Sequence, residues 1–136
     1  MSRIILSLKI KTTFVKDELL IRLIEIQDGH HLSCWSLPAN RCLFGLDDPL
    51  EEDEFQNWKI SVDPVEVREW LQILEFQKIS INPTLADFES RDGTSYQFQF
   101  FAEKGASIVL RWHNELPDNW AALDFIVDRL QELAKQ

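Results

Sequence analysis

The sequence predicts an α+β domain in which a largely antiparallel sheet carries two helices on one face. Several short runs alternate apolar and polar residues between turn signals, which is typical of half-buried strands. Two longer runs, about 64–77 and 118–134, place apolar residues three and four positions apart, as on one face of a helix. At 136 residues we expect a single domain over 1–136.

The first residues predict a strand rather than a secretory signal. Apolar positions alternate with polar ones, with Ile4, Leu6, Leu8 and Ile10 on one face and Ser7, Lys9 and Lys11 on the other. The lysines interrupt the apolar stretch and no small-residue cleavage site follows. No stretch reaches the length of a membrane span, so we expect a cytoplasmic protein without membrane contact.

Residues 19–37 predict a hairpin. Residues 19–27 also fit one face of a helix, but their isoleucine content and the following Asp28-Gly29 favour a strand that enters a tight turn. Residues 30–37 then form the return strand. With a two-residue turn, the expected cross-strand pairs are Leu23 with Cys34 and Ile26 with His31.

A surface loop is predicted over residues 38–57, which lack periodicity and contain Pro38 and Pro49. This loop of about 20 residues exceeds the usual length of a structureless connection, which favours a functional role. Residues 58–62 then alternate as a short strand.

The next segment predicts a helix that begins at Asp63-Pro64. Asp63 is an N-cap, Pro64 suits the first helical position, and Glu66 stands where a capping box places an acid. The apolar stripe that faces the core comprises Val67, Trp70, Leu71 and Leu74. The helix should end near residue 77, before a short strand around Ile79 and Ile81.

Residues 84–113 predict a three-strand meander with turns at Asp92-Gly93 and Lys104-Gly105. Three-residue loops give the expected pairs Phe88 with Phe98, Phe98 with Trp112 and Phe100 with Leu110. The opposite, polar face then carries Gln97, Gln99, Arg111 and His113. Pro117-Asp118 opens the terminal helix, whose apolar stripe comprises Trp120, Leu123, Ile126, Val127, Leu130, Leu133 and Ala134.

One acidic segment, residues 47–54, carries most of the net charge. Its six carboxylates in eight positions are Asp47, Asp48, Glu51, Glu52, Asp53 and Glu54. The chain has a net charge of −9, and without the segment it would have 17 acidic against 14 basic residues. Phe55 follows directly, and Trp58 stands three residues further on. Aromatic anchors beside concentrated charge favour docking of a basic protein, while a solvated loop is the simpler interpretation.

The sequence gives little support for nucleic-acid binding, metal binding or catalysis. Nucleic-acid binding is disfavoured because the basic residues are few and scattered. The acidic segment lacks the ligand spacing and central glycine of an EF-hand, so no calcium site is expected. His30, His31, Cys34 and Cys42 match no structural zinc pattern, and we expect both cysteines to be reduced. No catalytic motif or cofactor signature is present.

The second half resembles the immunity proteins of bacterial polymorphic-toxin and contact-dependent inhibition systems. The resemblance lies in Asp92-Gly93-Thr94-Ser95-Tyr96, the strand Ile108–Trp112, and Pro117-Asp118-Asn119-Trp120 leading into Ile126-Val127-Asp128-Arg129-Leu130. It implies a small cytoplasmic protein that binds and blocks a cognate toxin, often a basic nuclease. The class shares no functional motif, so the acidic segment as the toxin contact is our inference from its charge, its aromatic flank and the length of its loop.

Three hypotheses follow. The leading one is a non-enzymatic toxin inhibitor that binds through residues 47–58. The second is a small-ligand-binding protein or enzyme that uses the polar sheet face around Arg111 and His113, where a concave pocket is required. The third is a structural, homo-oligomeric subunit with an apolar sheet face. The sequence leaves the oligomeric state open.

Overall fold

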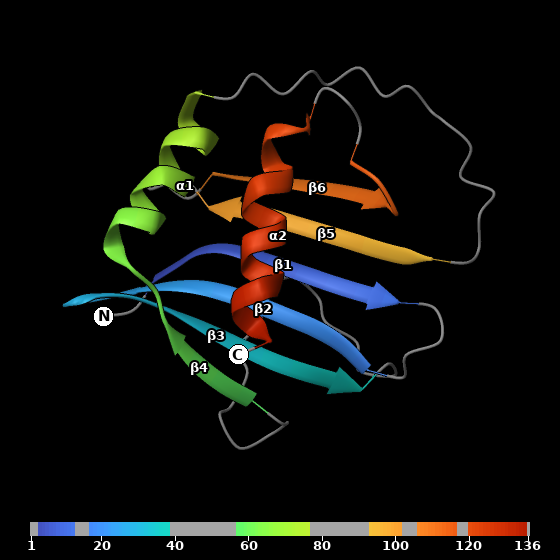
Figure 1. Ribbon diagram of the computed structural model, residues 1–136, viewed down its shortest axis with the longest axis horizontal. Coiled ribbons are helices and arrows are strands. Elements are labelled where there is room, and N and C mark those ends of the chain that lie inside the picture. Colours follow the sequence, from blue (N-terminus) through green and yellow to red (C-terminus); the bar gives the residue numbers. More distant parts are fainter. Residues whose placement is uncertain are drawn as a thin grey trace.

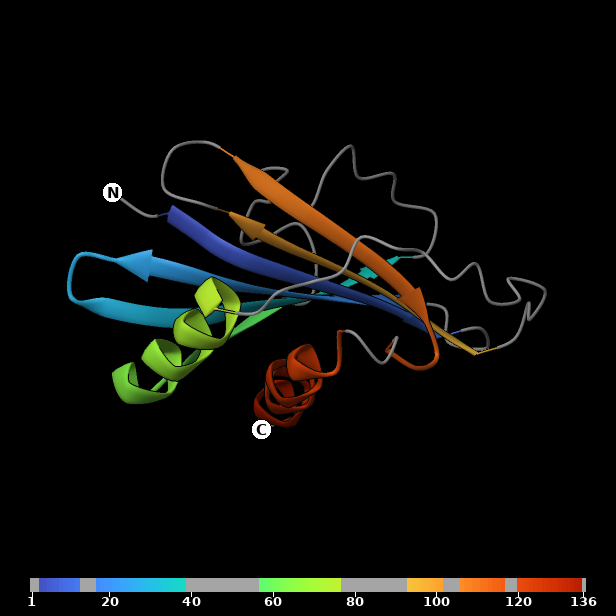
Figure 2. The ribbon, with the colours of Figure 1, turned by 90° about the horizontal axis from the view of Figure 1, so that it is seen from above.

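The computed structural model describes residues 3–12, 17–38, 57–76, 93–101, 106–116 and 120–135. Within these residues six antiparallel strands form one sheet, and two helices cover one of its faces (Figures 1 and 2). The strands lie in the order β4-β3-β2-β1-β5-β6. The predicted α+β class, the antiparallel sheet and the two helices on one face are confirmed. The elements are β1 (Arg3–Thr12), β2 (Asp17–Ile26), β3 (Gly29–Pro38), β4 (Asn57–Ser61), α1 (Pro64–Phe76), β5 (Thr94–Phe101), β6 (Ser107–His113) and α2 (Ala122–Ala134).

β1 lies in the interior of the sheet, between β2 and β5. Leu8 pairs with Ile21 on one side and with Phe98 on the other, and all three are buried. The alternation predicted for this strand holds from Leu6 onward. Before it, the pairing with β2 shifts between Ile4 and Leu6, and Ile5 rather than Ile4 enters the core. A β-bulge inserts one extra residue, so regular alternation cannot predict the face on its far side.

The hairpin of β2 and β3 is confirmed, but its predicted register is wrong by two residues. Leu23 pairs with Leu32 and Ile21 pairs with Cys34, because the turn consists of residues 27 and 28. Gly29 is therefore the first residue of β3, where its φ of +150° favours glycine. A shift of two residues leaves each side chain on its predicted face, since side chains alternate with a period of two.

The pairing of β5 with β6 needs the same correction. Phe98 pairs with Leu110 rather than Trp112, and Phe100 pairs with Ile108, in a register whose last described pair is Phe101 with Ser107. The predicted pairing of Phe88 with Phe98 is also wrong, since β1 occupies the other side of β5. The residues predicted for the first strand of the meander, and for the short strand around 79–81, lie outside the described residues.

The helices cap and pack largely as predicted. Oδ1 of Asp63 accepts a hydrogen bond of 2.9 Å from the backbone N–H of Val65, which confirms the N-cap. Glu66 does not close a capping box. Its carboxylate instead accepts hydrogen bonds from Arg129 of α2 and thereby links the two helices.

The core lies between the helices and the sheet. Trp70 of α1 and Leu123 and Leu130 of α2 are fully buried against it, together with Phe98 of β5. The predicted start of the terminal helix at Pro117-Asp118 lies outside the described residues. In the described part of the chain, neither helix is long and apolar enough to cross a membrane.

Candidate functional site

In the sequence, the acidic segment lies between the strands β3 and β4. Residues 39–56, which include all six carboxylates of the segment and Phe55, lie outside the described residues. Their flanks are described: β3 ends at Pro38 and β4 begins at Asn57. β3 and β4 are antiparallel neighbours, and β4 is the last of the described strands in the order on that side. The role of the acidic segment as a binding surface stays a prediction.

Trp58, the one predicted partner contact that is described, has a place in the fold. It pairs with Cys34 of β3 and packs, partly buried, against the hydrophobic core. Its indole Nε1–H donates a hydrogen bond of 3.1 Å to the carbonyl oxygen of Ala134, at the end of α2. Trp58 therefore ties β4 to the second helix. Its additional use as an anchor for a partner stays a prediction.

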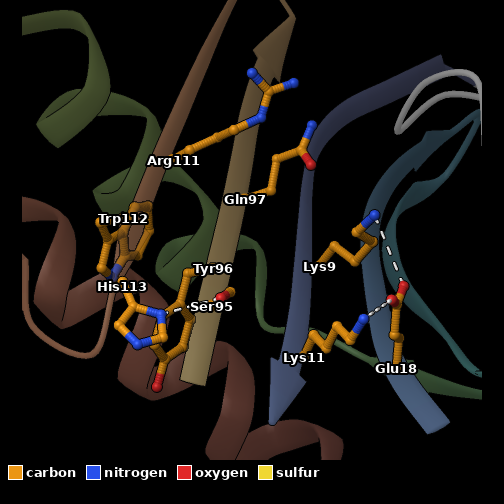
Figure 3. A pocket seen from close by; sticks show the side chains of 9 residues that line it. All are labelled: Lys9, Lys11, Glu18, Ser95, Tyr96, Gln97, Arg111, Trp112 and His113. Carbon is orange, nitrogen blue, oxygen red and sulfur yellow. Dashed lines mark hydrogen bonds and ion pairs between the residues drawn. The ribbon is translucent and has the colours of Figure 1, made fainter. Parts of the chain in front are cut away.

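A pocket of about 490 Å³ lies on the sheet near the ends of β1, β5 and β6 (Figure 3). The register explains which side chains meet there. Lys9 pairs with Gln97, and Gln97 pairs with Arg111. In the next row of the same face, Lys11 pairs with Ser95, and Ser95 pairs with His113. The described residues that line the pocket are Lys9, Lys11, Glu18, Ser95, Tyr96, Gln97, Arg111, Trp112 and His113.

Glu18 of β2 is the acidic member of this lining, and it is only 8% exposed. Its two carboxylate oxygens lie 3.7 Å from Nζ of Lys9 and 3.9 Å from Nζ of Lys11 (Figure 3). A buried carboxylate is costly unless it is paired, and the two ammonium groups offset that cost. Glu18 thus holds both lysine side chains on the polar face.

Ser95 and His113 form a further polar contact in the lining, with 3.1 Å between Ser95 Oγ and His113 Nδ1. They are direct cross-strand neighbours, which accounts for the contact. A nucleophilic serine needs a base that is itself oriented by a third group, together with donors for an oxyanion. This contact by itself is not such a constellation, and we treat both residues as lining.

The polar face is only partly open to water and thus differs from a sheet face that is solvated throughout. On the same face by register, Arg22 of β2 is 3% exposed and Trp35 of β3 is 6% exposed. The Arg22 guanidinium carbon lies 5.2 Å from the centroid of a Trp35 ring, which is a cation–π contact. The pocket therefore lies where a buried part of this face passes into an open part.

The structure brings together three of the four polar-face residues predicted from the sequence, namely Gln97, Arg111 and His113. Gln99 lies outside the pocket lining and donates a hydrogen bond of 3.1 Å to Oγ of Ser107. Sequence reasoning missed Lys9, Lys11 and Glu18 as site residues. The two lysines do alternate on the polar face of the first strand, but only the strand order reveals that this strand lies beside β5.

The cysteine and histidine residues give no metal centre in the described part of the chain. No group of three or more His, Cys, Asp or Glu there is arranged to hold a metal ion. Cys34 is a free, buried thiol, and burial raises its pKa to about 12. Nε2 of His30 lies 3.6 Å from Oε2 of Glu25 across the hairpin. Cys42 lies outside the described residues.

Among the described residues, the pocket thus collects three cationic side chains and one histidine around one carboxylate, in a protein of net charge −9. Ammonium, guanidinium, amide and hydroxyl groups are hydrogen-bond donors, so the arrangement suits a polar or anionic ligand.

Comparisons with protein-family models, with curated proteins and with solved structures found no match.

Proposed function

We propose that this protein is a non-enzymatic inhibitor that binds a basic protein, in the manner of a bacterial immunity protein that neutralises its cognate toxin in the cytoplasm. One observation carries the proposal: six carboxylates in eight positions hold most of the excess negative charge of the chain. The resemblance of the second half to immunity proteins supports it.

The mechanism follows from the concentration of the charge. A local cluster of one sign steers an oppositely charged partner and raises association rates by about 10–10³-fold at low salt. Phe55, next to the cluster, supplies an apolar anchor that slows dissociation. The partner surface would be basic, as in a nuclease that binds phosphates, so the segment would occupy the groove intended for nucleic acid.

For the test, a basic partner domain is first sought among the products of the neighbouring open reading frames. In one variant all six acids of the segment are changed to Asn or Gln. A matched control removes six exposed carboxylates elsewhere: Asp28, Glu69, Glu75, Glu115, Asp124 and Asp128. We expect the first variant to associate at least tenfold more slowly at low salt, with a flatter salt dependence, and to lose rescue of poisoned cells. Equal association and rescue by the two variants would refute the proposal.

A second candidate function is the binding of a small ligand on the polar sheet face. The observation that favours it is the pocket itself, whose volume of about 490 Å³ lies within the usual range of ligand sites, roughly 300–1,000 Å³. Its donors come from three strands of one sheet, so they are held on a rigid support. The two functions are assigned to different residues and are separable by mutation.

A further inference from the structure

We propose that this pocket binds the oxyanion group of a small organic ligand, a carboxylate or a phosphate monoester, with Arg111 as the principal contact. The proposal rests on the second candidate function and names its ligand class. Lys9 and Lys11 provide the remaining positive charge, and Gln97, Ser95 and His113 provide further polar contacts.

The register places these groups as two adjacent rows. Lys9, Gln97 and Arg111 lie side by side across β1, β5 and β6. Lys11, Ser95 and His113 form the neighbouring row. Figure 3 shows Gln97 and Arg111 extending from adjacent strands on the same side of the sheet as the lysines. A ligand over these rows therefore faces a surface dominated by donors.

Glu18, the one carboxylate among the described lining residues, does not cancel this positive surface. Glu18 has a side-chain exposure of 10%, whereas the exposures of Lys9 and Lys11 are 26% and 54%. Its oxygens are directed at the two ammonium groups, so an incoming anion meets the ammonium groups before the carboxylate (Figure 3). With Arg111 included, three cations face one paired carboxylate.

The geometry of the donors favours an oxyanion over a halide. A guanidinium group presents its N–H donors as a planar fork that matches two oxygens of a carboxylate or phosphate. The pocket is also larger than one oxyanion group needs. Its volume is about 490 Å³, whereas a small group such as one water molecule occupies roughly 30 Å³ in the liquid. The remaining space suits the organic body of the ligand.

The experiment is a titration of the full-length, ¹⁵N-labelled protein, followed by the backbone amide signals of Gln97 and Arg111 at constant ionic strength. The probes are inorganic phosphate, acetate and, as a neutral polar molecule, glucose. The variant R111Q removes the principal contact. R68Q is the matched control, because Arg68 is an exposed arginine of α1, on the helix-covered face, and its loss changes the net charge equally.

We expect saturable shifts with at least one of the two anions, a Kd raised about tenfold or more in R111Q, and a Kd within twofold of the unaltered value in R68Q. Saturation by phosphate alone assigns a phosphate ligand, and saturation by acetate alone assigns a carboxylate. Equal weakening in R111Q and R68Q overturns the proposal. Shifts with glucose alone overturn it while preserving a ligand-binding pocket. No shifts with any probe overturn both this proposal and the second candidate function.

Discussion

Replacing Trp58 separates its role in the fold from its predicted role as a partner contact. Trp58→Phe keeps an aromatic ring against the core but removes the indole N–H that binds the Ala134 carbonyl. Trp58→Ala removes the ring as well. Ala134 is only 7% exposed, so its carbonyl has little access to water as a substitute donor.

The magnitudes follow from these contacts. A hydrogen bond contributes about 0.5–1.5 kcal/mol net, and leaving a buried partner unsatisfied moves the cost upward, so we expect Trp58→Phe to lower the free energy of unfolding by about 1–2 kcal/mol. A fully buried Trp costs about 3–5 kcal/mol when changed to Ala. Since Trp58 is partly buried, we expect about 3 kcal/mol for Trp58→Ala.

Urea unfolding followed by far-ultraviolet circular dichroism measures both variants. The control is Phe125→Ala, which removes an aromatic ring that is 54% exposed on α2 and should change the free energy by less than about 0.5 kcal/mol. If Trp58→Phe unfolds like the unaltered protein, the hydrogen bond contributes nothing to the fold and the reasoning fails. Trp58 would then be available mainly for a partner, where a hot-spot aromatic is worth about 2 kcal/mol or more of binding energy.

Three further changes test the packing and the titration of the core. Trp70→Ala should cost about 3–5 kcal/mol because the side chain is fully buried, whereas Val65→Ala on the same helix should stay within about 0.5 kcal/mol, as measured by urea unfolding. Gly93→Ala should destabilise more than Gly29→Ala: both glycines have positive φ, but only at Gly93 does the added methyl group overlap a neighbouring side chain, and equal midpoints would contradict this. Burial raises the pKa of the Cys34 thiol to about 12 from an ordinary value near 9, so the unfolded state loses this proton at a lower pH than the folded state. The contribution of the protonated thiol to the free energy of unfolding is therefore complete below pH 9 and is lost as the pH rises toward 12. The Cys34→Ala variant should lack that part of the alkaline loss, and identical pH profiles of unfolding would contradict the assignment.

Local patterns predicted the elements, but they did not predict how the elements align. The stripe of Trp70 and Val67 and the N-cap at Asp63 each depend on neighbours within one helix, and the structure confirms them. The hairpin registers depend on which residues form each turn. Asp28-Gly29 is a strong turn signal, yet Gly29 pairs with Ile26 and the turn lies one residue earlier. The predicted side-chain faces are still correct, because the registers of β2 with β3 and of β5 with β6 were each wrong by two residues.

Only some residues of the candidate pocket could be predicted from the sequence, because the others depend on which strands lie side by side. Gln97 and Arg111 lie on adjacent strands of one hairpin, and alternation alone assigns them to the same face. Lys9 reaches the pocket through a pairing between residues 88 positions apart in the chain, Lys9 with Gln97. No local signal records that pairing, because apolar alternation identifies a strand without identifying its neighbours.

The interior position of β1 also has a consequence for biosynthesis. During synthesis, β1 gains its β5 neighbour only after the residues from the end of β1 up to Thr94 have been made, because β5 begins at Thr94. Until then the backbone amides and carbonyls along that side of β1 lack their native partners, which is the condition that promotes intermolecular strand association. Pairings of such long sequence separation also slow folding. Nascent chains halted before β5 should therefore be the species that chaperones hold and that self-associate on release.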